Sequence, residues 1–410
     1  MADMTAADLT YAPPSDLDAA RSRALMVGGV GLAACAVGFI FDRDHFFRAW
    51  LIGYLLWLGV ALGSMAFLMV QHLSGGSWGI FRRVFEASSR TLPLLAILFL
   101  PIVLGMQTLY PWTHPELVAA DEVLQHKAPY LNTPFFLIRA LIYMGGWILT
   151  AWTLTRLSRR QDEGDMSVNM TIQRVSGAGI VFYAFSITAA SIDWVMSLNP
   201  HWYSTLFGFI FLGGQGLSAL AFTIVASTFL SRRPPMDQLL KPSHFHDLGK
   251  LSLAFVMIWA YFNFSQYLLI YAANLIEEIP YFTVRTGHGW QYAVLFLVVF
   301  QFAVPFALLL SRDLKRTPRR LVVVAAALLV VRFIDIFMLV SPEFAATGEN
   351  LHMGHGEHDP HFFVHWLDLA APLAIGGLWV WMFFTQLAQR PLLAARDPYL
   401  REALQSTGGH

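Results

Sequence analysis

The sequence of 410 residues has little charge and almost no cysteine. Only 13% of its residues are charged, compared with about 25% in soluble domains, whereas 56% are hydrophobic. Basic and acidic residues number 27 each, so the basic excess that nucleic-acid binding requires is missing. The single cysteine, Cys35, excludes CxxC zinc sites, cysteine-ligated iron–sulfur clusters and a disulfide scaffold. These absences predict an integral membrane protein.

Long apolar stretches predict an all-α fold with about ten transmembrane helices, since each crossing needs roughly 20 mostly apolar residues. We expect an acidic N-terminal tail over 1–22, a single polytopic domain over 23–388 and a C-terminal tail over 389–410. The first tail contains Pro13 and Pro14 and lacks a basic start, so we expect no signal-peptide cleavage. The predicted spans are 24–41, 49–73, 91–110, 133–157, 175–195, 204–230, 247–274, 289–311, 319–341 and 364–388.

The basic residues are distributed unevenly between the two sides of these spans. Of the 27, two lie within spans (Arg139 and Arg332), and only four fall on the side away from the termini. The other 21 lie in the two tails or in the connections on the same side as the tails. The positive-inside rule therefore predicts that both termini are cytoplasmic.

Ionisable residues within or beside the spans are the main functional candidates. A charge at the centre of a span costs about 2.5–3.5 kcal/mol on insertion scales, so each one needs a partner, water or a function. Two pairs with i, i+3 spacing can each interact on one helix face. The proton-relay candidates are Arg139, Asp193, Glu277, Glu278, Arg332, Asp335, His365 and Asp368 in the outer half, with His72 near the inner end of the second span.

Two interpretations of these charges are open. They are either self-neutralising pairs that hold spans together, or parts of a hydrated proton path or ligand pocket. A cluster on five different spans at similar depth favours the second interpretation.

The histidines do not predict a haem or a metal site. His72 and His365 are the two at membrane depth, and they lie near opposite surfaces, so they cannot share a transmembrane haem. The outer connection over 352–361 (HMGHGEHDPH) is dense in imidazole, but its spacing fits no closed structural metal site. We predict that the chain binds no cofactor of its own and that this connection is either a mobile, hydrated loop or a surface for docking a partner.

Residues 78–85 (WGIFRRVF) have the pattern of a short amphipathic segment at the inner surface. We expect Arg82 and Arg83 to point towards lipid headgroups.

Three strings, over 130–139 (YLNTPFFLIR), 191–205 (SIDWVMSLNPHWYST) and 264–278 (FSQYLLIYAANLIEE), carry a family resemblance. They resemble the NrfD-like, polysulfide-reductase-type membrane subunits of alternative complex III, a bacterial quinol:cytochrome c or copper-protein oxidoreductase. The likeness spans roughly 45–390 and is greatest to the F subunit. The chain has Ile276 where the family pattern Asn-x-Pro-Glu-Glu has proline.

The resemblance implies two four-helix bundles, over about 49–195 and 204–341, flanked by spans one and ten. It implies a bacterial inner membrane and a set of partners: the paralogous C subunit, an iron–sulfur subunit, multihaem cytochromes and a terminal oxidase. Quinol oxidation in this family is tied to the C subunit. The F subunit is a candidate for proton conduction or for a second site for menaquinone or ubiquinone.

The residues are consistent with that role. Asp193, or the pair of Arg332 and Asp335, can accept a quinol proton if its pKa lies near ambient pH. A quinone pocket needs aromatic walls and a few polar groups, for which the candidates are Arg139, Trp147, Asp193 and Trp194.

Two other functions are open. A secondary transporter would have spans broken at matching positions in its two halves, as Pro101 and Pro305 suggest. A purely structural anchor would only pair its buried charges with one another.

Overall fold

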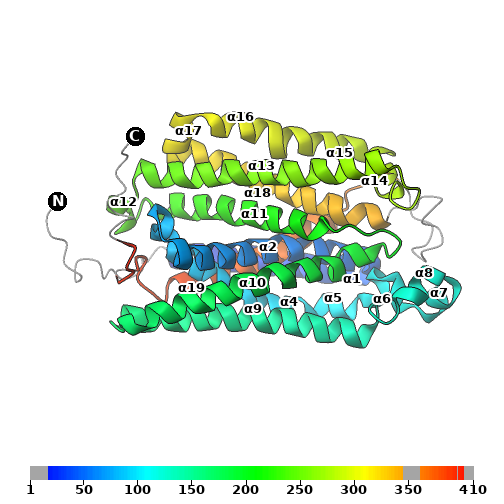
Figure 1. The fold of residues 1–410 in the computed structure, drawn as a ribbon. Helices are drawn as coiled ribbons and strands as arrows, with labels where there is room; N and C mark the ends of the chain where they lie inside the picture. The colour runs from blue at the N-terminus through cyan, green and yellow to red at the C-terminus, as the bar shows by residue number, and fades with distance from the viewer. Residues whose placement is uncertain (1–16, 345–360, 395, 401–410) are drawn as a thin grey trace.

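The computed structural model describes residues 17–344, 361–394 and 396–400, which are helical and contain no strand. Ten helices or helix groups among them are long and apolar enough to cross a membrane. They lie side by side along one axis (Figure 1), which confirms the predicted all-α class and the number of helices that are long and apolar enough to be spans. We call the end with α7, α8 and α14 the outer end, and the end with α12 and α17 the inner end.

The ten spans account for most of the chain. The first five are α1 (Leu17–Phe41), α2 (Arg43–Ser74), the group α3 (Arg82–Ser89), α4 (Leu92–Leu98) and α5 (Leu100–Leu104), α9 (Thr133–Asp162) and α10 (Asn169–Trp194). The second five are α11 (Phe207–Leu230), α13 (Pro242–Ala273), the group α15 (Trp290–Leu297), η6 (Val298–Ala303) and α16 (Val304–Leu310), α18 (Pro318–Val340) and α19 (Trp366–Leu387).

Short helices occupy the connections between spans. They are η2 (Ser77–Phe81), α6 (Met106–Leu109), η3 (Pro111–Thr113), α7 (Pro115–Ala120), α8 (Glu122–Lys127), η4 (Met166–Val168), η5 (Met196–Leu198), α12 (Met236–Leu239), α14 (Pro280–Thr286), α17 (Arg312–Arg316) and η7 (Ser341–Phe344).

Helix α2 is the core of the molecule, whereas α13 lies at its edge. Every residue over 49–56 is buried, because α2 packs against α10, α11 and α19 at once. On α13 an apolar stripe that includes Tyr261, Phe264 and Leu268 is exposed at helical spacing. Both helices are apolar all round, so composition alone does not distinguish a central helix from a peripheral one.

Helices α1 and α19 pack closely through small residues. A Cβ atom added at Gly377 would lie 2.2 Å from the backbone nitrogen of Gly28, and one added at Gly31 would lie 2.7 Å from the Cα of Ala374. Small residues let two backbones approach in this way. Helix α1 begins at Leu17, before the predicted start of its span, and is therefore a full-length helix.

Two spans are irregular where the sequence has proline. The third is divided into α3, α4 and α5, with Pro101 at the start of α5 and Gly105 directly after it. In the eighth, the π-helical turn η6 lies directly before Pro305. Proline lacks the N–H that would bond the carbonyl four residues earlier, here that of Gln301, and a π-turn is one way to accommodate the loss.

The seventh span ends with a left-handed residue, without a proline. Helix α13 stops at Ala273, and Asn274 has φ 50°. Asparagine tolerates this conformation better than most residues. Glu277 and Glu278 therefore lie in the turn that follows α13 and not on the helix itself.

Candidate functional site

Arg139 and Asp193 form a buried ion pair between α9 and α10. The Arg139 guanidinium donates from Nε to Asp193 Oδ2 at 2.8 Å and from Nη2 to Oδ1 at 3.0 Å. Tyr143, one turn further along α9, donates its hydroxyl to Oδ2 at 2.9 Å. Arg139 also stacks on the ring of Tyr130, at 3.9 Å from the centroid. This two-point contact fixes both carboxylate oxygens to the neighbouring helix.

Trp147 and Trp194 pack beside this pair. The Trp147 indole donates to Ser186 at 2.8 Å, and its ring lies 5.9 Å from that of Trp194 in an edge-to-face arrangement. Both tryptophans are fully buried. The structure therefore brings the four predicted quinone-pocket residues together, as a closely packed group.

Arg332 and Asp335 pair within α18, as their spacing predicts. The Trp259 indole of α13 donates to the same Asp335 oxygen, Oδ2, at 2.9 Å. Gly214 of α11 leaves room for the guanidinium, since a Cβ there would lie 2.2 Å from the Arg332 Cζ atom. Arg332 Nε is buried and has no hydrogen-bond partner among the residues that the structure describes.

His365 and Asp368 belong to a third group, at the start of α19. Asp368 accepts from the His365 backbone N–H at 2.8 Å and bonds the His45 ring of α2 at 2.9 Å. The His45 and His365 rings are 4.3 Å apart. Burial lowers the pKa of His365, and the nearby His45 adds to this effect, whereas Asp42 and Asp368 oppose it.

The predicted outer cluster is thus divided into separate groups. The pair of Arg139 and Asp193 is on α9 and α10, and that of Arg332 and Asp335 is on α18. Glu277 and Glu278 lie in the turn after α13, where Glu277 is exposed and Glu278 is half-buried. A further group was missed by sequence reasoning: Arg285 pairs with Glu343 at 2.6 Å, and Asn199 donates to the same carboxylate at 3.0 Å.

At the inner end, Glu86 is the centre of a dense buried network. It accepts from Arg82 at 2.9 Å, from Arg83 at 2.6 Å, from Ser158 at 2.7 Å and from Arg390 at 3.1 Å. The expectation that Arg82 and Arg83 point towards headgroups is wrong, because both side chains are buried. A carboxylate with three guanidinium partners explains why they turn inwards.

The acidic partners of these arginines come from distant parts of the chain. Asp162, at the end of α9, bonds Arg83 through both oxygens at 2.7 Å. Asp397 bonds Arg82 at 2.7 Å. The predicted candidate His72 lies nearby on α2 but makes a separate contact, a 2.9 Å bond to Ser176 of α10.

One face of α9 connects the outer pair with the inner network. Its polar residues, at intervals of three or four apart from one gap, are Arg139, Tyr143, Trp147, Thr155, Ser158 and Asp162. We call this set the α9 stripe. Residues three and four apart share one helix face. Ala151 takes the intermediate position, so the gap between Trp147 and Thr155 is about 12 Å at 1.5 Å per residue.

This spacing is the signal that sequence reasoning missed. The stripe is readable in the sequence, but it is hidden by apolar residues on every other face of α9. Trp259 and Arg390 gave no signal, because their partners Asp335 and Glu86 are 76 and 304 residues away.

In the described part of the chain, no group of three histidine, cysteine or carboxylate side chains has an arrangement that could hold a metal ion. Most of the histidine-rich connection, over 345–360, lies outside the described residues. His361, at its end, has its ring 5.6 Å from that of His288.

Comparison with known proteins adds no family assignment. No family model matches the chain, and no curated protein is significantly similar to it. The likeness to membrane subunits of alternative complex III therefore depends on the three sequence strings alone.

Proposed function

We propose that the chain is a membrane subunit of a bacterial quinol:cytochrome c or copper-protein oxidoreductase, in which it provides a proton path and a scaffold. In this proposal it crosses the inner membrane ten times with both termini in the cytoplasm. Its partners are a paralogous C subunit, an iron–sulfur subunit, multihaem cytochromes and a terminal oxidase. Menaquinone or ubiquinone is the substrate of the complex, and the chain has no redox centre of its own.

The α9 stripe is the observation that supports this proposal best. It leads from Asp193, bonded by Tyr143 and Arg139, to Ser158, bonded to Glu86. Buried carboxylates with hydroxyl neighbours are the usual parts of a proton relay in a membrane. Quinol oxidation releases protons as well as electrons, and the side chains of the stripe are of the kinds that can transfer the protons.

The α9 stripe has no polar member between Trp147 and Thr155, so a proton path needs another carrier at this level. Between Trp147 and Thr155 it passes Thr150, which donates to the Gly146 carbonyl, and Gly179 of α10. A Cβ at Gly179 would lie 2.9 Å from the Thr150 methyl group, so the helices are in close contact there. We therefore propose that water must enter this level for a proton to cross, which makes it the slow step.

The family arrangement of two four-helix bundles is part of the same proposal. Helices α2, α9 and α10 pack together in the first half, and α11, α13 and α18 do so in the second. The contact between α2 and α11 joins the two sets.

Reconstituted complex carrying Asp193→Asn tests the relay. We expect proton release to fall about 100-fold, within the range for loss of one acid–base group, while the complex still assembles. Vesicles with an internal pH dye report the protons, and cytochrome reduction reports the electrons. Asp247→Asn is the matched control, because Asp247 is partly exposed near the inner end of α13. Unchanged proton release in the Asp193 variant would contradict the relay.

A second candidate, a secondary transporter, is favoured by the broken third and eighth spans. These occupy matching positions in two five-span halves, and each contains an interior proline, Pro101 or Pro305. Native purification separates the two proposals: copurifying cytochromes support the oxidoreductase, and an oligomer of this chain alone supports the transporter.

A further inference from the structure

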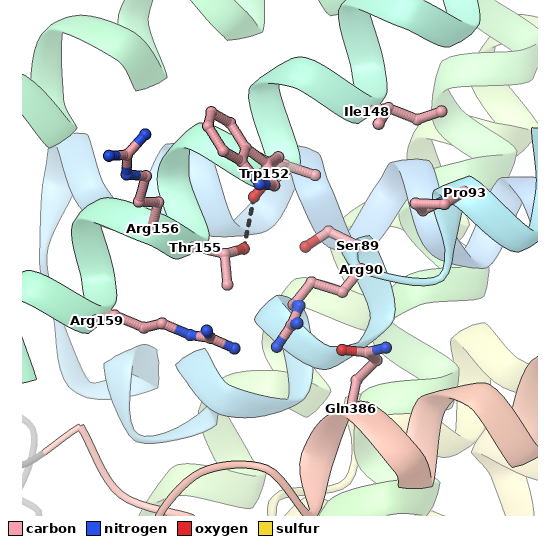
Figure 2. A pocket seen from close by; sticks show the side chains of 10 residues that line it. Ser89, Arg90, Pro93, Ile148, Trp152, Thr155, Arg156, Arg159 and Gln386 are labelled. Carbon is pink, nitrogen blue, oxygen red and sulfur yellow. Dashed lines mark hydrogen bonds between the residues drawn. The ribbon is translucent and has the colours of Figure 1, made fainter.

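A cavity of about 420 Å³ opens at the inner end, between α9, α19 and the turn that joins α3 to α4. It lies beside the α9 stripe, and Thr155 belongs to the stripe and also lines the cavity. Figure 2 shows the guanidinium groups of Arg90 and Arg159 pointing towards one another across it, with the Gln386 amide beside Arg90. Two like charges that face each other in this way repel, and an anion between them would relieve the repulsion.

Among the described residues, the protein supplies no such anion to the cavity. No acidic residue lines it, and neither Arg90 nor Arg159 makes a side-chain hydrogen bond or ion pair with a residue that the structure describes. The Arg90 Nη1 and Gln386 Oε1 atoms are both buried without a partner within the described ranges. Arg156, also at the cavity, makes only a contact with the Trp152 ring, at 5.3 Å from its centroid.

The nearest carboxylates are already neutralised. Glu86, at the narrow extension of the cavity, is held by Arg82, Arg83 and Arg390. Burial lowers the pKa of Arg390 to about 10; Glu86 opposes this, whereas Arg83 and Arg159 add to it. The positive charge of the region therefore exceeds what its acidic residues can balance.

The other wall of the cavity is apolar. Pro93 of α4 and Ile148 of α9 line it on the side towards the middle of the spans. Beyond them, Ile97 and Leu149 continue the same two helices with exposed aliphatic side chains. Trp152 is 55% exposed at the rim, and tryptophan of this kind is enriched where a bilayer meets water. A ligand that fits both walls has an anionic head and a hydrocarbon tail.

We propose that this cavity binds the phosphate headgroup of an anionic phospholipid, whose acyl chains lie along α4 and α9. Basic pockets between transmembrane helices on the cytoplasmic side bind such headgroups. A planar guanidinium offers paired donors to phosphate oxygens, and Gln386 supplies a neutral contact beside them. The inference rests on the membrane placement in the proposed function, but not on proton transfer.

Lipid retention by the purified complex tests the inference. Native mass spectrometry after mild delipidation compares wild type with Arg90→Gln plus Arg159→Gln, which we expect to bind cardiolipin or phosphatidylglycerol about 30-fold more weakly. Arg319→Gln plus Arg320→Gln is the matched control, since it removes the same charge from exposed positions at the inner end of α18. Equal loss in both variants, or none in either, would overturn the inference.

Further measurements distinguish an anionic lipid from other ligands, and a single-residue variant shows whether the loss of lipid comes from misfolding. Added inorganic phosphate should not displace the lipid, whereas full displacement would assign the site to a soluble anion. Zwitterionic phosphatidylethanolamine should not refill it. Arg159→Gln alone changes an exposed side chain, so it should weaken retention without altering assembly. Loss of lipid with normal proton release would leave the proposed relay intact, and the reverse result would leave the lipid site intact.

Discussion

Two buried aspartates, Asp193 on α10 and Asp335 on α18, are held in different ways. Arg139 reaches Asp193 from another helix and contacts both of its oxygens. Asp335 pairs with Arg332 on its own helix, and Trp259 contacts the same single oxygen, Oδ2. The first ion pair links two helices, whereas the second is formed within one helix and is connected to α13 through the neutral Trp259 indole. Breaking the first pair should therefore disturb helix packing more than breaking the second.

The largest expected effect is a difference in stability between variants of Arg139 and Arg332. Arg139→Met should destabilise the protein by about 3–5 kcal/mol, because it leaves a buried carboxylate unpaired and removes the link between α9 and α10. Arg332→Met should cost about 1–3 kcal/mol, since Trp259 still bonds Asp335. Thermal unfolding in detergent measures both. Equal losses would remove the distinction between the pairs, and Arg139→Met with Asp193→Leu should recover most of the larger one.

For the neutral hydrogen-bond donors, the expected loss of stability is larger at Asp335 than at Asp193, the reverse of the order for the two arginines. Trp259→Phe removes the only contact from another helix to Asp335 described above, at about 1.5–3 kcal/mol for a hydrogen bond to a charged group. Tyr143→Phe should cost about 1 kcal/mol, because Asp193 retains both bonds from Arg139. The same unfolding assay applies, with Tyr261→Phe as the control for removing an exposed hydroxyl. A larger loss for Tyr143→Phe would reverse the comparison.

The histidine group adds a pH dependence that the arginines do not have, since arginine stays charged throughout the ordinary range. The pKa of His365 is lowered by burial and by His45, so the unfolded chain takes up its proton first as the pH falls. Stability should therefore decrease as the pH falls below about 6.5, the ordinary histidine value, and level off below the folded pKa. His365→Gln should flatten this part of the profile. An unchanged profile would exclude His365 as its source.

The smallest effect is expected at the turn after α13. Glu277→Gln with Glu278→Gln should change stability by no more than about 0.5 kcal/mol, because Glu277 is exposed, Glu278 is half-buried and neither forms an ion pair with a described residue. A larger loss would mean that the turn carries a structural charge, as the two aspartates do.

The sequence predicted those parts of the fold that depend on local pattern. Ten spans follow from apolar length, and the pair of Arg332 and Asp335 follows from its i, i+3 spacing. The packing of Asp193 with Arg139 did not follow, because 54 residues separate them and α9 is apolar on most of its circumference.

The network around Glu86 shows why contacts between distant parts of the chain could not be predicted from the sequence. Arg82 and Arg83 have the pattern of a surface segment, and only the positions of Glu86, Asp162 and Asp397 in space turn them inwards. Local amphipathicity cannot report partners that come from the far end of the chain.

The close contact between Gly28 and Gly377 has a consequence for biosynthesis. Helix α1 is synthesised well before α19, its most extensive packing partner, and eight other candidate spans lie between them in the sequence. The glycine face of α1 therefore stays without this partner until α19 has been made. A chain truncated before α19 would leave the face uncovered, so the stable packing of α1 depends on a helix encoded about 350 residues later.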